Sequence, residues 1–173
     1  EIVPFTQKAD VYVINTCSVT NMADRKSRQM LHKAKKNNPD SIVVAAGCYV
    51  QTSEKEVLND LSVDIVIGND RKHDLVRLLE EYSLDSVNDT VDDINDGKHD
   101  FEELFIDQTK EHTRAFIKVQ DGCNQFCSYC IIPYARGRVR SRRFENVIAE
   151  VERLAANGFK EVVLTGIHLS SYG

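Results

Sequence analysis

Three short apolar runs, rich in β-branched and small residues, constrain the fold of this chain most strongly. They lie at residues 11–14, 42–46 and 65–67. Each run is nearly continuous and is soon followed by polar residues or glycine, which is typical of strands buried on both faces of a parallel sheet. Helical periodicity between and after the runs predicts helices over about 22–36, 53–61 and 72–82, with Asn21 and Thr52 as N-caps. This alternation predicts an open parallel α/β sheet.

The composition changes after residue 82. Residues 83–112 are rich in Asp, Asn and Ser and weakly periodic, so we interpret them as an acidic linker. A second unit, 113–173, contains a strand over 115–120, a cysteine-rich loop, a helix over 144–157 and a strand over 161–165. This order is typical of the start of a (β/α) barrel. We therefore expect a truncated α/β domain over 1–82 and the first part of a barrel over 113–173.

The net charge of −5 is unevenly distributed along the chain. Residues 83–111 contain ten acidic side chains and two lysines, whereas residues 114–143 contain seven basic side chains and one aspartate. A basic stretch of this kind can bind a phosphate backbone, so the overall acidity does not exclude a nucleic-acid partner.

Five cysteines, an odd number, argue against a disulfide framework and favour metal binding in a reducing compartment. No apolar run is long enough to span a membrane, and no basic-then-apolar leader is visible. We expect a cytoplasmic protein with no membrane partner.

The spacing C-x3-C-x2-C marks the loop that begins at Cys123 and continues through Cys127 to Cys130. Thiolates are the ligands of iron–sulfur clusters, and three of them leave one iron of a [4Fe–4S] cube without a protein ligand. That iron can chelate the amine and carboxylate of S-adenosylmethionine. The aromatic Tyr129 just before the last cysteine favours this interpretation, and the loop follows the first barrel strand, where barrel active sites lie.

A structural zinc knot is the alternative for the same loop. Structural zinc takes four ligands, commonly from paired C-x2-C units, and here the fourth would be a distant His or Cys. In that case the chain would be a zinc-stabilised RNA-binding module without redox chemistry.

Two further cysteines each follow a predicted strand. Cys17 comes after the first strand and Cys48 after the second. In a parallel sheet both would lie at the carboxyl edge, where ligands gather. The alternative is two unrelated buried cysteines that behave as small hydrophobic residues.

Four segments, taken together and in this order, resemble the methylthiotransferase family of radical S-adenosylmethionine enzymes. They are NTCSVT at 15–20, AGCY at 46–49, the stretch from DGC to the arginine and glycine at 121–137, and LTGIH at 164–168. The resemblance implies addition of a methylthio group to an unreactive C–H bond, on adenosine-37 of a tRNA or on an aspartate of a ribosomal protein. Residues 131–137 and 165–168, with Arg140 and Arg142, look like the branch that acts on N6-threonylcarbamoyladenosine. The N6-isopentenyladenosine branch is the alternative.

The resemblance also implies the cofactors and partners. A radical cluster on Cys123, Cys127 and Cys130 would split S-adenosylmethionine, and the resulting radical would take hydrogen from C2 of adenine. An auxiliary [4Fe–4S] cluster would supply sulfur, and a second S-adenosylmethionine the methyl group. Cys17 and Cys48 match two of the three auxiliary ligands, with the other expected upstream of Glu1. Expected partners are a tRNA anticodon loop, an electron donor such as flavodoxin or ferredoxin, and a sulfur donor.

Each of the remaining candidate site residues has two possible interpretations. A dense arginine run beside the cysteine loop would contact tRNA phosphates or form a solvated face paired with the acidic linker. It consists of Arg136, Arg138, Arg140, Arg142 and Arg143. Gly166 would let the backbone approach the methionine moiety or simply make a turn. His168, beside it, would bind the cofactor or play a structural role.

Overall fold

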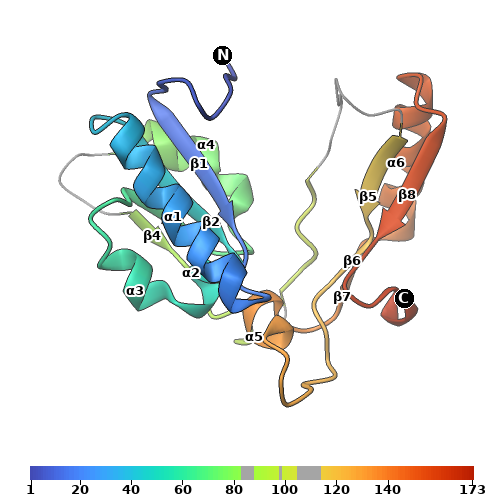
Figure 1. The fold of residues 1–173 in the computed structure, drawn as a ribbon. Helices are drawn as coiled ribbons and strands as arrows, with labels where there is room; N and C mark the ends of the chain where they lie inside the picture. Colours follow the sequence, from blue (N-terminus) through green and yellow to red (C-terminus); the bar gives the residue numbers. More distant parts are fainter. Residues whose placement is uncertain (83–87, 98, 105–113) are drawn as a thin grey trace.

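The N-terminal unit is built on a four-stranded parallel sheet, as expected. The computed structural model describes residues 1–82, 88–97, 99–104 and 114–173. The strands stand in the order β1-β2-β3-β4, and all neighbours are parallel. Their bounds are Val11–Thr16 for β1, Ile42–Gly47 for β2, Ile65–Ile67 for β3 and Asn88–Thr90 for β4. Figure 1 shows α1 on one face of this sheet and α4 on the other.

Helices connect the strands and cover both faces of the sheet. They are α1 (Asn21–Asn37), α2 (Cys48–Thr52), α3 (Glu54–Leu58), the 3₁₀ helix η1 (Lys72–Asp74) and α4 (Leu75–Glu80). Tyr12 and Val43 pack with Leu31 of α1, while Val44 and Ile65 pack with α4 on the opposite face. The middle strands are therefore apolar at successive positions, which explains the continuous runs in the sequence.

The helix ends differ from the expected ones. Thr20, and not Asn21, caps α1, because the Thr20 hydroxyl accepts a hydrogen bond from the amide of Ala23 at 3.1 Å. The expected helix over 53–61 is shorter and is α3, and a separate short helix, α2, precedes it with Thr52 as its last residue. Ser53 occupies the N-cap position of α3 without a side-chain hydrogen bond.

The acidic tract expected as a linker takes part in the fold. Its residues 88–90 form β4 beside β3, and Ile94 is buried. The Nδ1 atom of His99 lies 2.9 Å from the Asp70 carboxylate, and Glu103 forms an ion pair with Arg142 at 2.6 Å. Its charges are thus used to join segments of the chain that are far apart in sequence. Residues 83–87, 98 and 105–113 of this tract lie outside the described residues.

The second unit contains the expected strand–loop–helix–strand sequence. Strand β5 (Arg114–Lys118) pairs in parallel with β8 (Glu161–Thr165), and α6 (Phe144–Ala156) packs on one face. Ala115, Ile117 and Leu154 form the centre of this core. The strand expected over 115–120 is interrupted, because β6 (Gln120–Asp121) turns away and pairs antiparallel with β7 (Arg140–Ser141).

Two short helices complete the described chain. They are α5 (Ile132–Arg136) and the 3₁₀ helix η2 (Leu169–Ser171). Figure 1 shows that α5 lies beneath the N-terminal sheet, at the end of a long loop that leaves the second unit. Across the described parts of the chain, no helix has the length and apolar character that a membrane span needs.

Candidate iron–sulfur and S-adenosylmethionine sites

Cys17 and Cys48 lie side by side at the carboxyl edge of the N-terminal sheet. Their preceding residues, Thr16 and Gly47, are paired across β1 and β2. The Thr16 hydroxyl donates to the carbonyl of Ala46 at 2.7 Å and accepts from the amide of Tyr49 at 3.2 Å, which joins the two strand ends. Cys17 is exposed and Cys48 is buried. The placement at one edge agrees with the sequence prediction.

Gly47 makes this close approach possible. It adopts a φ of 101°, and a Cβ at this position would lie 2.6 Å from the carbonyl oxygen of Thr16. Any other residue would therefore combine backbone strain with a clash. The glycine before Cys48 is a steric requirement of the edge that holds the two thiols.

Polar groups surround the sulfur of Cys48. Asn69 Nδ2 lies 3.5 Å from this sulfur, and the Arg136 guanidinium is near enough to interact with it electrostatically. Burial lowers the pKa of the neighbouring Lys72 amine, with the Arg136 charge adding to the effect. A ligating thiolate carries negative charge and accepts hydrogen bonds, so donors of this kind fit a cysteine that ligates iron.

The loop with the other three cysteines begins at a tightly packed glycine. Gly122 has a φ of 73°, and a Cβ there would lie 1.9 Å from the carbonyl oxygen of Arg138. The amide of Cys123 donates to the carbonyl of Gly137 at 3.1 Å, and this contact closes the base of the loop. Phe126, in the middle of the loop, has a φ of 48°. The loop is therefore a fixed structure at its base.

The three thiols of this loop are unpaired and reach the surface to different extents. Cys127 is exposed, whereas Cys123 and Cys130 are partly exposed. The Cys123 sulfur accepts a hydrogen bond from the amide of Gln125 at 3.5 Å, and the amide of Cys130 donates to the carbonyl of Cys127 at 2.9 Å. The number, type and accessibility of these donors fit a cluster that binds a small molecule from outside.

Within the described residues, no three Cys, His, Asp or Glu side chains converge as ligands of one metal ion. A cubane is bound through different iron atoms, so its thiolates stand farther apart than the ligands of a single zinc ion.

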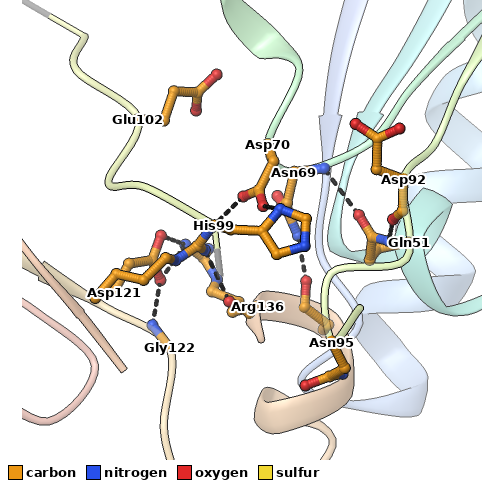
Figure 2. Close-up of polar contacts among 12 residues, drawn as sticks. Gln51, Asn69, Asp70, Asp92, Asn95, His99, Glu102, Asp121, Gly122 and Arg136 are labelled. Atoms are coloured by element: carbon orange, nitrogen blue, oxygen red, sulfur yellow. Dashed lines mark hydrogen bonds and ion pairs between the residues drawn. The ribbon is translucent and has the colours of Figure 1, made fainter. Parts of the chain in front are cut away.

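Asp121 anchors the start of the cysteine loop. Its carboxylate accepts hydrogen bonds from the amide of Gly122 at 2.9 Å and from Lys118 Nζ at 2.9 Å, and it lies 3.4 Å from Arg136 Nη1. Burial alone would raise the pKa of Asp121, but Lys118 and Arg136 outweigh it and the pKa lies below its ordinary value. Figure 2 shows Asp121 and Arg136 pointing toward each other.

A fully buried glutamine connects the cysteine loop to the end of β8. Gln120 Nε2 donates to the carbonyls of Asp121 and Gly122 at 2.7 and 2.8 Å, and its Oε1 accepts from the amide of His168 at 2.7 Å. A Cβ on Gly166 would lie 2.9 Å from this oxygen. The need for glycine at 166 is therefore explained by packing against Gln120.

The other residues expected at the cofactor site are placed differently. Tyr129 is 91% exposed. Both ring nitrogens of His168 lie within hydrogen-bond distance of serines, Nδ1 at 2.6 Å from Ser171 Oγ and Nε2 at 3.2 Å from Ser170 Oγ. These contacts orient the His168 ring just beyond the end of β8.

The arginine run is not a uniform face. Arg142 is buried, pairs with Glu103 at 2.6 Å and forms a further ion pair with Glu150. Arg140 pairs with Asp70 at 2.5 Å. The expectation of RNA contact is therefore corrected for Arg142, because its guanidinium is enclosed by carboxylates.

Two arginines of the run remain exposed, Arg138 and Arg143. The guanidinium of Arg138 lies 4.3 Å from the centre of the Phe126 ring, which places a cation on an aromatic face at the tip of the cysteine loop. Of the alternative interpretation, a solvated face paired with the acidic tract, only the pairing is found at Arg142, through Glu103, because Arg142 itself is buried.

Sequence reasoning missed Gln120, Asp121 and Asn69 as site residues. Asn69 follows β3 by two residues, so the rule that placed Cys17 and Cys48 at the sheet edge could have found it. No comparable signal marks Gln120, because its burial depends on β6 leaving the first sheet.

Two family models match the chain. Residues 1–68 match the model described as "Uncharacterized protein family UPF0004", and residues 117–172 match the radical SAM superfamily. The threonylcarbamoyladenosine tRNA methylthiotransferase MtaB of Aquifex aeolicus is 48% identical over 100% of this chain and 42% of its own length. The protein of the same name from Bacillus subtilis is 45% identical, with 98% and 38% covered.

The chain belongs to the radical S-adenosylmethionine methylthiotransferase family. Another relative, the tRNA-2-methylthio-N(6)-dimethylallyladenosine synthase of a Thermoanaerobacter species, is 37% identical over 96% of this chain and 36% of its own. The chain spans about two fifths of the length of these methylthiotransferases.

A solved structure has a similar fold. The radical S-adenosylmethionine methyltransferase TsrM of Kitasatospora setae superimposes with a TM-score of 0.58 at 17% identity, covering 96% of this chain and 39% of that one. The likeness concerns the fold and agrees with an α/β unit followed by the strand–loop–helix–strand unit.

Proposed function

We propose that this chain is part of a cytoplasmic tRNA methylthiotransferase that converts N6-threonylcarbamoyladenosine at position 37 to its 2-methylthio form. Three free thiols on a closed loop at the carboxyl end of the β5–β6 segment, in a chain of this family, are the observation that carries the proposal. The choice of nucleoside is supported by the names of the relatives at 48% and 45% identity. N6-isopentenyladenosine-37 is the alternative substrate, because the relative that is 37% identical is named for a dimethylallyladenosine product.

Two cluster sites are assigned on this proposal. Cys123, Cys127 and Cys130 would hold the radical [4Fe–4S] cluster, and Cys17 and Cys48 would contribute to an auxiliary one. The radical cluster, when reduced, supplies the electron that splits S-adenosylmethionine. The donor set fits, because all five thiols are free and each group lies at a carboxyl strand end.

The protein's own residues bind and orient around these sites. Gln120 holds the base of the cysteine loop against the end of β8, so that Gly166 and His168 stand at a fixed place relative to Cys123. We assign this end of β8, with Tyr129, to S-adenosylmethionine. Binding and orientation are the protein's share of such reactions, because the cofactor performs the difficult step.

The tRNA anticodon loop is the proposed macromolecular partner. Arg138 and Arg143 are the exposed cations beside the cysteine loop that can reach phosphates, and the Arg138–Phe126 pair offers a surface on which an unstacked base can lie. A low-potential electron donor such as flavodoxin or ferredoxin and a sulfur donor complete the proposed system.

Mass spectrometry of tRNA nucleosides tests the substrate. Cells that lack the full-length protein should lose 2-methylthio-N6-threonylcarbamoyladenosine and keep its precursor, and the wild-type gene should restore it. A Cys127→Ala gene should fail to restore it. Loss of the isopentenyladenosine derivative instead would transfer the proposal to that substrate, and no change in either nucleoside would overturn it.

Reconstitution tests the cofactor. Anaerobic incubation with iron and sulfide should give brown protein that bleaches on reduction with dithionite, and Cys127→Ala should lower the bound iron. Stoichiometric zinc with no iron would instead support the zinc-stabilised binding module.

A further inference from the structure

Arg136 lies between the two groups of cysteines. It is the last residue of α5, which begins two residues after Cys130 and packs against α2, the helix that begins at Cys48. Its Nη1 is 3.4 Å from both carboxylate oxygens of Asp121, two residues before Cys123. On its other side the thiol of Cys48 lies near enough to interact electrostatically with the guanidinium.

Asn69 provides a second connection at the same place. Its Nδ2 lies 2.5 Å from the carbonyl oxygen of Ala135 and 3.5 Å from the sulfur of Cys48. Asn69 is only 7% exposed, so water cannot readily replace these contacts. Figure 2 shows Asn69 reaching from the N-terminal sheet toward α5, close to Arg136.

The Arg136 guanidinium has a carboxylate partner in Asp121. An arginine guanidinium is always protonated in proteins, and the Asp121 carboxylate 3.4 Å away is its partner here. Asp121 is itself held by Lys118 and by the amide of Gly122. A cation near the Cys48 sulfur is thus held in place by a carboxylate of β6, at the start of the cysteine loop.

We propose that Arg136 is a positioning residue that ties the helix of Cys48 to the start of the loop 123–130, and that its positive charge acts on the Cys48 sulfur. This replaces the expectation that Arg136 contacts tRNA phosphates. The part that concerns charge rests on the proposed function, because it requires Cys48 to ligate a cluster. The part that concerns the tie holds for the protein without iron.

The physical consequence is a link between the two sites. A hydrogen bond to a ligating sulfur and a nearby cation both favour the more negative, reduced state of a cluster. Because the same guanidinium pairs with Asp121, a movement of the loop that carries Cys123 changes the position of this charge relative to the Cys48 sulfur.

Hydrogen exchange of the iron-free protein tests the tie. Arg136→Gln should raise exchange at least tenfold both in residues 48–52 and in residues 122–125. Arg136→Lys retains a cation and should recover part of the protection in both segments. Arg114→Gln removes an exposed arginine that also faces a carboxylate, Glu161 at 3.5 Å, and as the matched control it should leave both segments unchanged. Circular dichroism verifies that each variant is folded.

The reduction potential of the auxiliary cluster in the full-length, iron-loaded protein tests the charge. Arg136→Gln should shift the reduction equilibrium about tenfold toward the oxidised form, about 59 mV for one electron. Asp121→Asn removes the counter-charge of Arg136 and should shift it in the opposite direction. A residue with only a packing role would not give opposite signs for the two variants.

These results separate the proposal from the proposed function. Exchange that rises in one segment only, or in neither, overturns the tie. Potentials that move in the same direction for both variants overturn the charge effect. If no cluster forms on Cys48, the charge part fails together with the auxiliary-cluster assignment, while the exchange result still decides the tie.

Discussion

Single residues in this chain matter most where a side chain cannot be accommodated. Gly47 and Gly122 precede Cys48 and Cys123, and each has a positive φ with backbone oxygen where a Cβ would stand. The same local feature thus occurs at both groups of thiols. It brings the backbone of the cysteine-bearing segment against a neighbouring segment. This close approach sets the position of the cysteine that follows.

Gly122→Ala tests this feature at the cysteine loop. We expect a loss of at least about 2 kcal/mol in the free energy of unfolding, because the backbone strain of a positive φ is joined by a clash with the Arg138 carbonyl. Gly158→Ala is the matched control. It has a φ of 91° and no atom within 4 Å of its Cβ, so it should cost about 1 kcal/mol. Urea denaturation measures both, and equal losses would contradict the clash.

Asp74 predicts a specific dependence of stability on pH. Hydrogen bonds from Arg71, and then from Arg77, hold the pKa of Asp74 below its ordinary value. Its contribution is therefore fully present above the unfolded pKa of about 3.9 and is lost as the pH falls through the lower folded pKa. Asp74→Asn should be less stable than wild type at pH 6, and the difference should shrink toward pH 2. A difference that stays constant from pH 6 to pH 2 would argue against this ion pair.

At the scale of elements, two neighbouring residues at the start of α1 differ in whether they cap the helix. The sequence suggested Asn21 as the cap, whereas the Thr20 hydroxyl accepts the hydrogen bond from Ala23. Thr20→Ala should therefore lower the free energy of unfolding by about 1 kcal/mol. Asn21→Ala should change it by less than about 0.5 kcal/mol, as expected for an exposed position. Thermal and urea unfolding compare the pair, and a larger effect at Asn21 would show that the cap is misassigned.

At the scale of the whole molecule, charged residues join the two units. Asp70, just beyond β3, pairs with Arg140 of β7 at 2.5 Å and with His99 at 2.9 Å. Figure 2 shows Asp70 and His99 facing each other beside Arg136. Because Arg140 is nearly enclosed, with 9% of its side chain exposed, removing its partner leaves a charge with little access to water.

A double-mutant cycle measures this connection. Asp70→Ala should lower the free energy of unfolding by about 3 kcal/mol, because Arg140 remains enclosed without its carboxylate. Adding Arg140→Ala should recover part of that loss, with a coupling of about 1–3 kcal/mol. Asp10→Ala, which removes an aspartate at an exposed position, is the control. Additive losses in the double variant would mean that the two residues do not support each other.

The sequence by itself determined the parallel α/β sheet, the strand–loop–helix–strand unit after it and the two groups of cysteines. These follow from local information: continuous apolar runs mark buried strands, and the parallel arrangement puts Cys17 and Cys48 at one edge. The spacing of Cys123, Cys127 and Cys130 likewise depends only on neighbours in the chain.

Only the tertiary structure decided which charges are free and which are used. Arg142 and Arg138 stand four residues apart in one basic run, yet one is enclosed by Glu103 and Glu150 and the other is exposed. Their partners come from distant segments, and the pairing follows from where β6, β7 and α5 lie after folding. Long-range contacts of this kind leave no periodic trace in the sequence, which is why Gln120 and the role of Arg136 became visible only in the folded chain.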